Sequence, residues 1–398
     1  MSLSEDTSLE QRLSAFSTYE STPDAAYKLF EEARAAGCPV AHSEKLDGFH
    51  MFLDYDDVRG AHADWETFRS SPQVLRPIAP RPSFPPLEYD PPEQTAWRQL
   101  FAKALNIDTP KQQRAGVVEI VGELIDGLKT AGEFDIVHDF SEPVALYTLC
   151  NILGFDHALR DEVRRLTIEM HAAAGDPEAG AAAFMAFAEF GLGEVMKRKA
   201  EPREDYLTEL GNATIDGRAL EPPEIGAAMN SLLNAGHGTT VAGLTSLIHE
   251  VWTRPDIKAA LIADPSLIPA AVEESMRLHT PFFGLYRTVS KGVTVGGVDL
   301  VPGDSCLMMW AAANRDPKVF ENPEEFRLDR SGRKRLMTFG FGIHACMGQP
   351  TARMEMEVAL GALLERIPDM ELVDPDAVEY HFGGSETAAI RSLPARIA

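Results

Sequence analysis

Cysteine is scarce in this sequence, and so is positive charge. The four cysteines among 398 residues are widely spaced, and no two of them form a Cys-x-x-Cys pair. This spacing argues against a zinc site and against a disulfide framework. The 37 lysines and arginines are outnumbered by 61 aspartates and glutamates, which gives a net charge of −24. Because phosphate backbones and anionic lipid headgroups repel such a chain, we expect no binding to nucleic acid or to membranes.

An unbroken hydrophobic run is also missing. The chain begins with polar and acidic residues, and no basic segment followed by an apolar one indicates a secretory signal. The nearest candidate for a membrane span, residues 225–248, contains Asn230, Asn234 and His237, whereas a span needs about 18 consecutive apolar residues. We therefore expect a soluble, cytoplasmic protein, with a monomer as the default.

The spacing of apolar residues predicts a mainly helical chain. A hydrophobic share of 44% and a charged share of 25% are ordinary for a globular protein. Strands are expected within 42–54 and at 293–295, 299–301 and 305–309. Helices are expected over 25–36, 56–63, 93–104, 110–130, 143–153, 160–174, 178–199, 221–252, 256–263, 269–279 and 349–367. The expected fold class is mainly α with small β-sheets (α+β), in a single domain over residues 21–398 that follows a flexible tail of residues 1–20.

Prolines crowd the segment from residue 70 to residue 90. Proline removes backbone donors and prevents long helices and strands, so this segment is expected to be a loop. Irregular loops of about twenty residues are uncommon in compact chains and are usually functional, although a plain connector is the alternative. The prolines are Pro72, Pro77, Pro80, Pro82, Pro85 and Pro86.

A single cysteine lies in a glycine-rich segment just before the last expected helix. From Phe339 to Gly348 the chain reads Phe-Gly-Phe-Gly-Ile-His-Ala-Cys-Met-Gly. Its glycines allow sharp turns and a close approach to a large flat ligand, and N–H groups at the helix start favour a thiolate at Cys346. An axial thiolate ligand to haem iron has these requirements. Taken alone, a cysteine is more often a small buried residue.

The same segment also fits Gly-x-Gly-x-x-Ala, a pattern that is typical of dinucleotide-binding loops. Only about fifty residues follow it, which leaves no room for the second half of a nucleotide-binding sheet. Residues 333–338, which precede it, also form a poor candidate for a buried strand. The dinucleotide interpretation is therefore disfavoured.

Two further segments carry paired polar residues at helical spacing. Glu274 and Arg277 lie three residues apart in an expected helix and share a face, although such a pair is usually a weak surface ion pair. Gln94 and Arg98 lie four residues apart near the start of another helix, where they offer two donors to a carboxylate. Each signal is weak by itself.

The helix expected over 221–252 contains the sequence Asn-Ala-Gly-His-Gly-Thr-Thr. Gly236 and Gly238 each weaken a helix by about 1 kcal/mol relative to alanine, and they can open it for a ligand. The hydroxyl groups of the two threonines that follow can bond to freed carbonyl groups or to water. The alternatives are a close helix–helix crossing and, for His237, a hydrogen-bonded residue of the core.

Together these segments resemble the cytochrome P-450 haem-thiolate monooxygenases of the soluble bacterial type, and they are similar to camphor-hydroxylase-like members. The resemblance runs from about residue 90 to the last residue. The motif Phe-x-x-Gly-x-His-x-Cys-x-Gly is highly specific, and Glu-x-x-Arg lies at the expected distance before it. Between them, residues 311–317 and 323–326 look like the meander of this family. The resemblance implies a triangular prism of helices around a buried haem b (iron protoporphyrin IX).

The resemblance also implies roles for individual residues. Cys346 would be the iron ligand, within a cofactor-binding loop that includes Phe339, Gly340 and Gly348. Glu274 and Arg277 would become a buried structural pair. The implied donors to the haem propionates are Gln94, Arg98, Arg287 and His344.

The implied reaction inserts one atom of O2 into a C–H bond and reduces the other to water, with two electrons and two protons. In this family an acid usually precedes the helix threonine, but here Gly238 precedes Thr239. We expect Thr239 with ordered water, aided by His237, to deliver protons, or hydrogen peroxide to enter instead. A peroxide-driven peroxygenase is therefore one alternative, and a non-catalytic haem-binding protein is another.

Electrons are expected to come from another protein, because no flavin-binding or iron–sulfur segment is recognised in the chain. The implied source is NAD(P)H through a reductase and a [2Fe-2S] ferredoxin. Cations near the cysteine segment predict a docking patch for an acidic ferredoxin, and a solvated turn is the alternative. The residues expected there are Arg98, Arg333, Lys334, Arg335 and Arg353, with Arg330 in the same cluster.

The substrate pocket is placed by analogy with the family. Its expected walls are mostly apolar, which favours a small hydrophobic substrate such as a terpenoid or an alkylated or methoxylated aromatic, for hydroxylation or O-demethylation. Arg76 or Arg81 can pair with a substrate carboxylate, although loop arginines more often face water. The expected pocket residues are Leu75, Ile78, Phe84, Leu87, Leu232, Leu233, Gly236, Phe282, Phe283, Leu285, Gly384 and Ser385.

Overall fold

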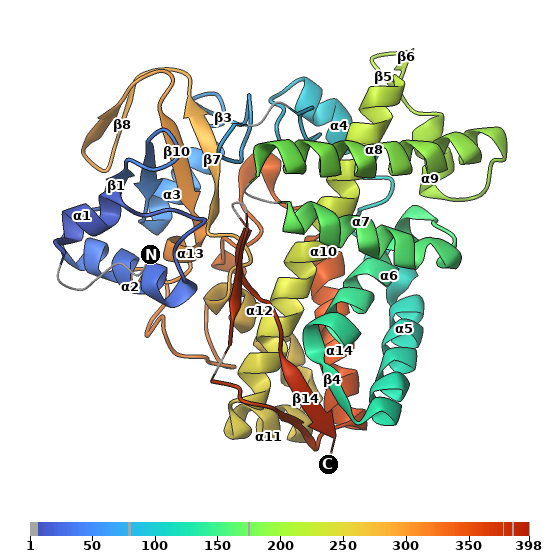
Figure 1. Ribbon diagram of the computed structural model, residues 1–398. Helices are drawn as coiled ribbons and strands as arrows, with labels where there is room; N and C mark the ends of the chain where they lie inside the picture. Colours follow the sequence, from blue (N-terminus) through green and yellow to red (C-terminus); the bar gives the residue numbers. More distant parts are fainter. Residues whose placement is uncertain (1–6, 79–80, 174–175, 377, 384–385, 398) are drawn as a thin grey trace.

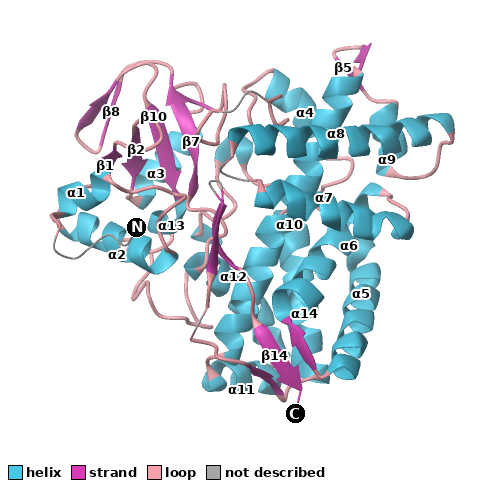
Figure 2. Cartoon of the chain, viewed as in Figure 1, coloured by secondary structure: helices cyan, strands magenta, loops and turns pink. Residues whose placement is uncertain are grey.

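The computed structural model describes residues 7–78, 81–173, 176–376, 378–383 and 386–397. Most helices gather in one half of the molecule, and the largest sheet lies in the other half (Figure 1). Figure 2 shows that strands are a minor part of the fold beside the helices. The expected class, mainly α with small sheets, is confirmed.

Helix α10 (Pro222–Trp252) runs through the centre of the helical half (Figure 1). Prolines occupy its first turn, where no N–H partner is needed, and the Glu224 carboxylate accepts a hydrogen bond from the N–H of Glu221 at 2.8 Å. Most of its side chains are buried, because several helices pack against it. These are α6 (Glu142–Leu153), α8 (Pro177–Ala200), α12 (Ile268–Leu278) and α14 (Gln349–Arg366).

The expected helices agree with the structure to within three residues at each end. Three further helices, α1, α9 and α13, were not expected, because helices of four to six residues are too short to show a periodic pattern. The other α-helices of the described residues are α1 (Leu9–Ser14), α2 (Pro23–Ala35), α3 (Tyr55–Ala63), α4 (Glu93–Phe101), α5 (Thr109–Ala131), α7 (Arg160–Ala172), α9 (Tyr206–Gly211), α11 (Pro255–Ala263) and α13 (Trp310–Ala313). The short 3₁₀ and π segments are η1 (Ile136–Ser141), η2 (His157–Leu159), η3 (Pro265–Leu267), η4 (Arg333–Arg335) and η5 (Gly342–His344).

The largest sheet has the strand order β1-β2-β10-β7-β3. Strand β10 runs parallel to β2 and antiparallel to β7. Strand β10 was expected, but β7 was not, because nearly all of its side chains are buried and no alternation between polar and apolar residues marks it. The strands are β1 (Val40–Ser43), β2 (Phe49–Phe52), β3 (Phe68–Arg69), β7 (Gly284–Val289) and β10 (Ser305–Met309).

Small sheets complete the fold. Strands β11, β14 and β4 form one sheet of three, and three hairpins pair β5 with β6, β8 with β9 and β12 with β13. Strand β8 has the expected bounds, and β9 begins one residue earlier than expected. The bounds are β4 (Glu133–Asp135), β5 (Thr214–Ile215), β6 (Arg218–Ala219), β8 (Val293–Val295), β9 (Val298–Leu300), β11 (Met370–Leu372), β12 (Tyr380–Gly383), β13 (Glu386–Ile390) and β14 (Pro394–Ile397).

The start of the chain differs from the flexible tail expected over residues 1–20. Over residues 7–20 it contains α1, whose N-terminus is capped reciprocally by Ser8 and Gln11. Phe16 follows, is fully buried, and packs edge-on against Phe30 and Phe283. The contact between Phe16 and Phe283 joins residues that are far apart in the sequence. The polar composition of the segment did not predict it.

One described helix, α8, is long and apolar enough to cross a membrane by length and composition, over Glu178–Ala200. Of its most apolar stretch, 33% is buried inside the protein. It packs against α7, α9 and α10. Length and composition alone are weak evidence for a span, because core helices pass the same test.

Candidate active site

A cavity of about 280 Å³ lies between α10, α14, the cysteine segment and the proline-rich loop. It brings together residues that are distant in the sequence, among them Arg98 from α4, Thr239 from α10 and Cys346. Phe339, His344 and Gly348 line it as well. The expected pocket residues that line it are Leu75, Phe84, Leu87, Leu232, Gly236, Phe282 and Leu285.

Glycines set the path of the cysteine segment. Gly340 and Gly342 have φ values of +67° and +71°, in the left-handed region that favours glycine. A side chain at Gly342 would also place its Cβ 2.6 Å from the carbonyl oxygen of His62. The segment closes on itself where the N–H of Cys346 donates to the carbonyl of Phe339 at 2.8 Å. The position of the sulfur is therefore set by the main chain and not by a helix or strand.

The Cys346 side chain is exposed to the cavity, although protein surrounds the segment. Burial raises the pKa of its thiol. The N–H groups of Gly348 and Gln349 and the cations of Arg98 and Arg353 act in the opposite direction and lower that pKa. The groups that stabilise a thiolate are thus present around the sulfur.

Arg98 and His344 line one edge of the cavity, and Arg287 lies close to them. Arg98 donates to the carbonyl of Ala345 at 3.0 Å. The His344 Nε2 lies 2.9 Å from the hydroxyl of Ser70, whereas its Nδ1 is buried without a partner. Burial, together with Arg287 and Arg98, lowers the pKa of His344 to about 3. Buried cations and an orphaned ring nitrogen fit a ligand that carries carboxylates.

Arg287 and Gln94 take different places from those expected. Arg287 does not line the cavity, but it lies close enough to influence the pKa of His344, and burial lowers its own pKa to about 10. The Gln94 side chain donates to the carbonyl of Ile343 at 2.6 Å. Gln94 therefore supports the cysteine segment and does not line the cavity.

Glu274 and Arg277 are fully buried, with exposed fractions of 0% and 1% and a closest approach of 2.9 Å. The interpretation as a surface ion pair is therefore wrong. Arg277 also donates to the carbonyls of Asn314 and Pro323. Arg330, expected in a solvent-facing cluster, is buried as well and donates to Glu274 at 2.7 Å. Two guanidinium groups thus share one buried carboxylate.

Helix α10 continues without a break past Gly236 and Gly238. A Cβ at Gly236 would lie 3.1 Å from Leu149, so this glycine permits a close helix approach. The Thr239 hydroxyl donates to the carbonyl of Ala235 at 2.9 Å, as in an ordinary helix. The expected opening of the helix is not found.

Of the residues expected to move protons, only Thr239 lines the cavity. His237 is buried, and neither it nor Gly238 lines the cavity. Successive residues of a helix are turned by about 100°, so residue 237 lies on the far side of α10 from residue 239. The expected help from His237 is therefore not supported.

Other expected pocket residues lie elsewhere for similar reasons. Leu233 follows Leu232 around α10 and is buried in the core, and Phe283 alternates with Phe282 and packs against Phe16. Ile78 is 56% exposed and lines a second pocket. Gly384 and Ser385 lie outside the described residues.

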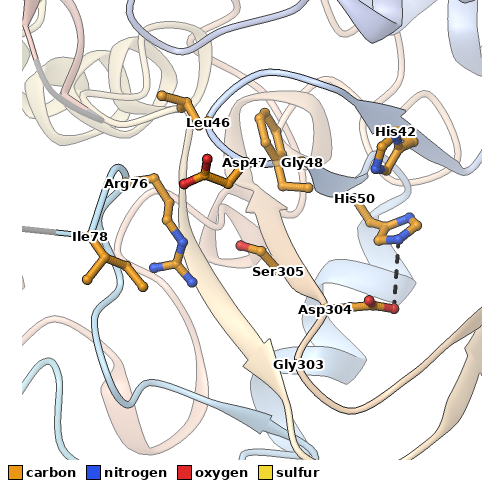
Figure 3. Close-up of a pocket in the computed structure, with 11 residues that line it drawn as sticks. His42, Leu46, Asp47, Gly48, His50, Arg76, Ile78, Gly303, Asp304 and Ser305 are labelled. Atoms are coloured by element: carbon orange, nitrogen blue, oxygen red, sulfur yellow. Dashed lines mark ion pairs between the residues drawn. The ribbon is translucent and has the colours of Figure 1, made fainter.

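This second pocket, of about 300 Å³, lies at the largest sheet and shares no lining residue with the cysteine cavity (Figure 3). Its wall is mostly polar and includes Arg76, Asp47 and His50, which lies 3.9 Å from Asp304 (Figure 3). Arg76 donates to the carbonyl of Gln73 at 2.7 Å. It does not line the cysteine cavity.

A buried carboxylate holds the proline-rich loop together. Glu88 accepts hydrogen bonds from both terminal nitrogens of Arg81 and from the N–H groups of Val74 and Phe84, all within 3.1 Å. Phe84 then packs edge-on against Phe184 of α8 at 5.3 Å. Arg81 is therefore occupied inside the loop and is not available to a substrate carboxylate.

The cations expected at the docking patch do not all lie on one exposed surface. Arg98 lines the cavity, and Arg353 pairs with Glu273. Arg335 is exposed, and Arg333 is partly exposed and donates to Leu328; the side chain of Lys334 lies outside the described part. Arg59, which sequence reasoning missed, lies 4.4 Å over the Phe341 ring. Its position in α3 gives no sign of this contact.

Several residues of the cavity wall were not found from the sequence. Thr338, Met347, Thr351 and Glu355 surround the cysteine side, and Phe101, Leu105, Leu149 and Ile152 extend the apolar wall. The apolar residues look like ordinary helix faces. Glu355, a charged residue between Met354 and Met356, was the one signal available.

The comparisons with known proteins agree with this geometry. Residues 262–368 match the sequence model of the family described as Cytochrome P450. Cytochrome P450 107B1 of Saccharopolyspora erythraea is 33% identical over 88% of this chain and 90% of its own length. The 6-deoxyerythronolide B hydroxylase of the same organism is 36% identical over 73% of this chain and 72% of its own length.

The solved structures agree as well. Cytochrome P450 CYP109Q5 from Chondromyces apiculatus superposes with a TM-score of 0.86 and 28% identity, and the match covers 97% of this chain and 99% of that one. A thiol that faces an apolar cavity, with unneutralised donors at its edge, fits the haem b of that family. The chain belongs to the cytochrome P450 family, as a monooxygenase of the bacterial type.

Proposed function

We propose that this enzyme inserts oxygen into a small hydrophobic substrate, a terpenoid or an alkylated or methoxylated aromatic, by hydroxylation or O-demethylation. The carrying observation is the cavity wall, in which Leu75, Phe84, Leu87, Leu232 and Leu285 line the same mostly apolar cavity as Cys346. An apolar wall of this kind selects its ligand by shape and by burial of apolar surface. Haem, when bound, supplies the iron at which dioxygen is activated.

We propose that Cys346 binds the iron, that Arg98 and Arg287 neutralise the propionates, and that His344 is a neutral hydrogen-bond donor to them. The buried His344 Nδ1 that lacks a hydrogen-bond partner, and the Arg98 and Arg287 guanidinium groups that act on His344, support this placement. The N–H groups at Gly348 and Gln349 act on the sulfur and temper its electron donation.

Two spectra test this function. The carbon-monoxide-bound, reduced protein is expected to show the absorption band of a haem thiolate. A panel of terpenoids and methoxylated aromatics is then expected to shift the iron spin state, whereas polar compounds of the same size are not. Spin-state shifts with the polar set alone would overturn the substrate proposal.

The proposed electron source is NAD(P)H through a reductase and a [2Fe-2S] ferredoxin that docks beside the cysteine segment. Arg335, Arg333 and Arg59 are the cations of the described surface that support it. The substitution Arg335→Glu is expected to slow reduction about tenfold at low salt and by less at high salt, since steering is screened. A reduction rate that changes neither with salt nor with this substitution would argue against the docking patch.

A second candidate is a peroxide-driven reaction, which is favoured by Gly238 because no acid precedes Thr239 in α10. The reaction of a C–H substrate with hydrogen peroxide gives alcohol and water and needs no reductase. Product formed faster from peroxide than from NAD(P)H with its partners would favour this candidate. Location in the cytoplasm and a monomeric state are also proposed, and size-exclusion chromatography tests the latter.

A further inference from the structure

Two polar side chains of α10 lie on the mostly apolar wall of the haem cavity. Ser231 and Asn234 are three residues apart, so they share a face of the helix, and both line the cavity. The hydroxyl oxygen of Ser231 and the amide oxygen of Asn234 are buried without a hydrogen-bond partner in the described part of the chain. Ser231 is only 7% exposed. Folded proteins leave few buried polar atoms unsatisfied, so these two indicate a missing partner.

Neighbouring polar groups of α10 are bound within the protein. The Thr239 hydroxyl donates to the carbonyl one turn earlier, which is the usual bond of such a hydroxyl in a helix, whereas the Ser231 hydroxyl does not. The Asn230 amide oxygen also lacks a partner, but Asn230 is fully buried away from the cavity and donates to the carbonyl of Phe184 at 3.0 Å. Only for Ser231 and Asn234 can the partner be a molecule in the cavity.

The partner that these two residues fit is a neutral group. Arg98 is the one arginine or lysine among the described residues that line the cavity, and it is proposed for the haem propionates, whereas Arg76 and Arg81 do not line it. A carboxylate beside Asn234 would therefore be desolvated without a cation. An alcohol needs none. Its O–H donates to an amide or hydroxyl oxygen, and its own oxygen accepts from the amide nitrogen or from the Ser231 hydroxyl.

We propose that Ser231 and Asn234 bind a hydroxyl group of the substrate, which is a neutral terpene alcohol with an otherwise apolar skeleton. This inference rests on the proposed function and narrows its substrate class. Because an α-helix rises about 1.5 Å per residue, Asn234 lies about 7.5 Å along α10 from Thr239, the residue expected to deliver protons. Oxidation is therefore expected at a carbon several bonds from the hydroxyl group. The alcohol, O2, two electrons and two protons then give a diol and water, and the carbon that bears the first hydroxyl is not oxidised.

The experiment offers the haem-loaded protein several terpene skeletons, each as the alcohol, the parent hydrocarbon and the carboxylic acid, and titrates the spin-state shift. The wild type is expected to bind the alcohol about tenfold more tightly than the hydrocarbon, and the acid least tightly. In Asn234→Leu the affinity for the alcohol is expected to fall about tenfold, while that for the hydrocarbon stays or rises. Ser231→Ala is expected to lower the affinity for the alcohol about threefold.

The matched control is Asn151→Leu, which removes a partly buried asparagine of α6 that does not line the cavity. It is expected to keep the wild-type ratio of affinities for alcohol and hydrocarbon. The carbon-monoxide-bound, reduced spectrum of every variant is expected to be that of the wild type, which shows that each one is folded around haem.

Product analysis gives a second readout. The wild type is expected to form one diol, and Asn234→Leu a mixture of positional isomers. Equal affinities for alcohol and hydrocarbon in the wild type, equal losses of both in Asn234→Leu, or a ketone as the main wild-type product would overturn this inference alone. Equal affinities would mean that water occupies the site. If no skeleton shifted the spin state in any form, the proposed terpenoid substrate would be wrong, and this inference with it.

Discussion

The two walls of the haem cavity are held in place by different means. The cysteine wall has little regular structure, but main-chain hydrogen bonds and glycine conformations fix it. The buried Glu274 network adjoins it through Asn314, which accepts from Arg277 and bonds to Met337 and Thr338. The opposite wall depends on α10 and on one loop, closed by Arg81 and Glu88 and by one aromatic contact. The contrast suggests that substitutions on the substrate wall can change selectivity while the iron site stays intact.

The largest effect is expected from Cys346→Ser, which removes the sulfur from the cysteine wall. Haem-thiolate absorption and turnover should both be lost, because a hydroxyl is a poor substitute for a thiolate ligand. The control Cys38→Ser, at a thiol that bonds to the Val40 carbonyl away from the cavity, should keep both. If the haem-thiolate absorption persisted in Cys346→Ser, Cys346 would not be the iron ligand, and the comparison of the two walls would lose its basis.

The next largest effect is expected from Arg277→Met. It leaves Glu274 buried with one guanidinium partner fewer, and breaking a buried pair costs about 3–5 kcal/mol of unfolding free energy. Arg396→Met removes an exposed pair with Glu371 and should cost about 0–1 kcal/mol. Urea unfolding of both variants measures the difference, and equal losses would show that burial of the network does not matter.

A smaller effect is expected from Arg81→Met on the opposite wall. It leaves the buried Glu88 carboxylate with only the N–H groups of Val74 and Phe84 as donors, and a buried acceptor that loses a donor costs about 1–3 kcal/mol of unfolding free energy. Substrate affinity, titrated by the spin-state shift, should weaken about tenfold, which corresponds to about 1.4 kcal/mol. The carbon monoxide spectrum should not change. Loss of that spectrum together with affinity would mean that the two walls are coupled.

The smallest effect is a pH dependence of stability caused by Glu355. Its folded pKa lies well above the ordinary 4.5, so above that pH the unfolded chain releases a proton that the folded protein keeps. Unfolding free energy should therefore fall by up to about 1.4 kcal/mol per pH unit until the folded pKa is passed. In Glu355→Gln this contribution should vanish. If the free energy of unfolding of the two proteins changed with pH in the same way, burial would not have raised the pKa of Glu355.

Sequence patterns predicted more of the cysteine wall than of the opposite wall. The motif around Cys346 led to the iron-ligand candidate, because main-chain geometry restricts which residues fit there. The buried Glu274–Arg277 pair was implied by the family resemblance, whereas the spacing alone favoured a surface pair. The substrate wall was only partly predicted. Adjacent residues such as Leu232 and Leu233 have the same chemistry, and only the rotation of α10 decides which of them meets the cavity. Glu355 was missed because its burial depends on the contact between α14 and α10.

The sharing of Glu274 has a consequence for recombination between relatives. Arg330, 56 residues along the chain, uses the same carboxylate as Arg277 of α12. A crossover between α12 and residue 330 would take Glu274 and Arg330 from different parents, although their surroundings had packed together within one parent. Chimeras should therefore inherit residues 268–330 as one block, and libraries built on that boundary should yield more folded members than libraries cut inside it.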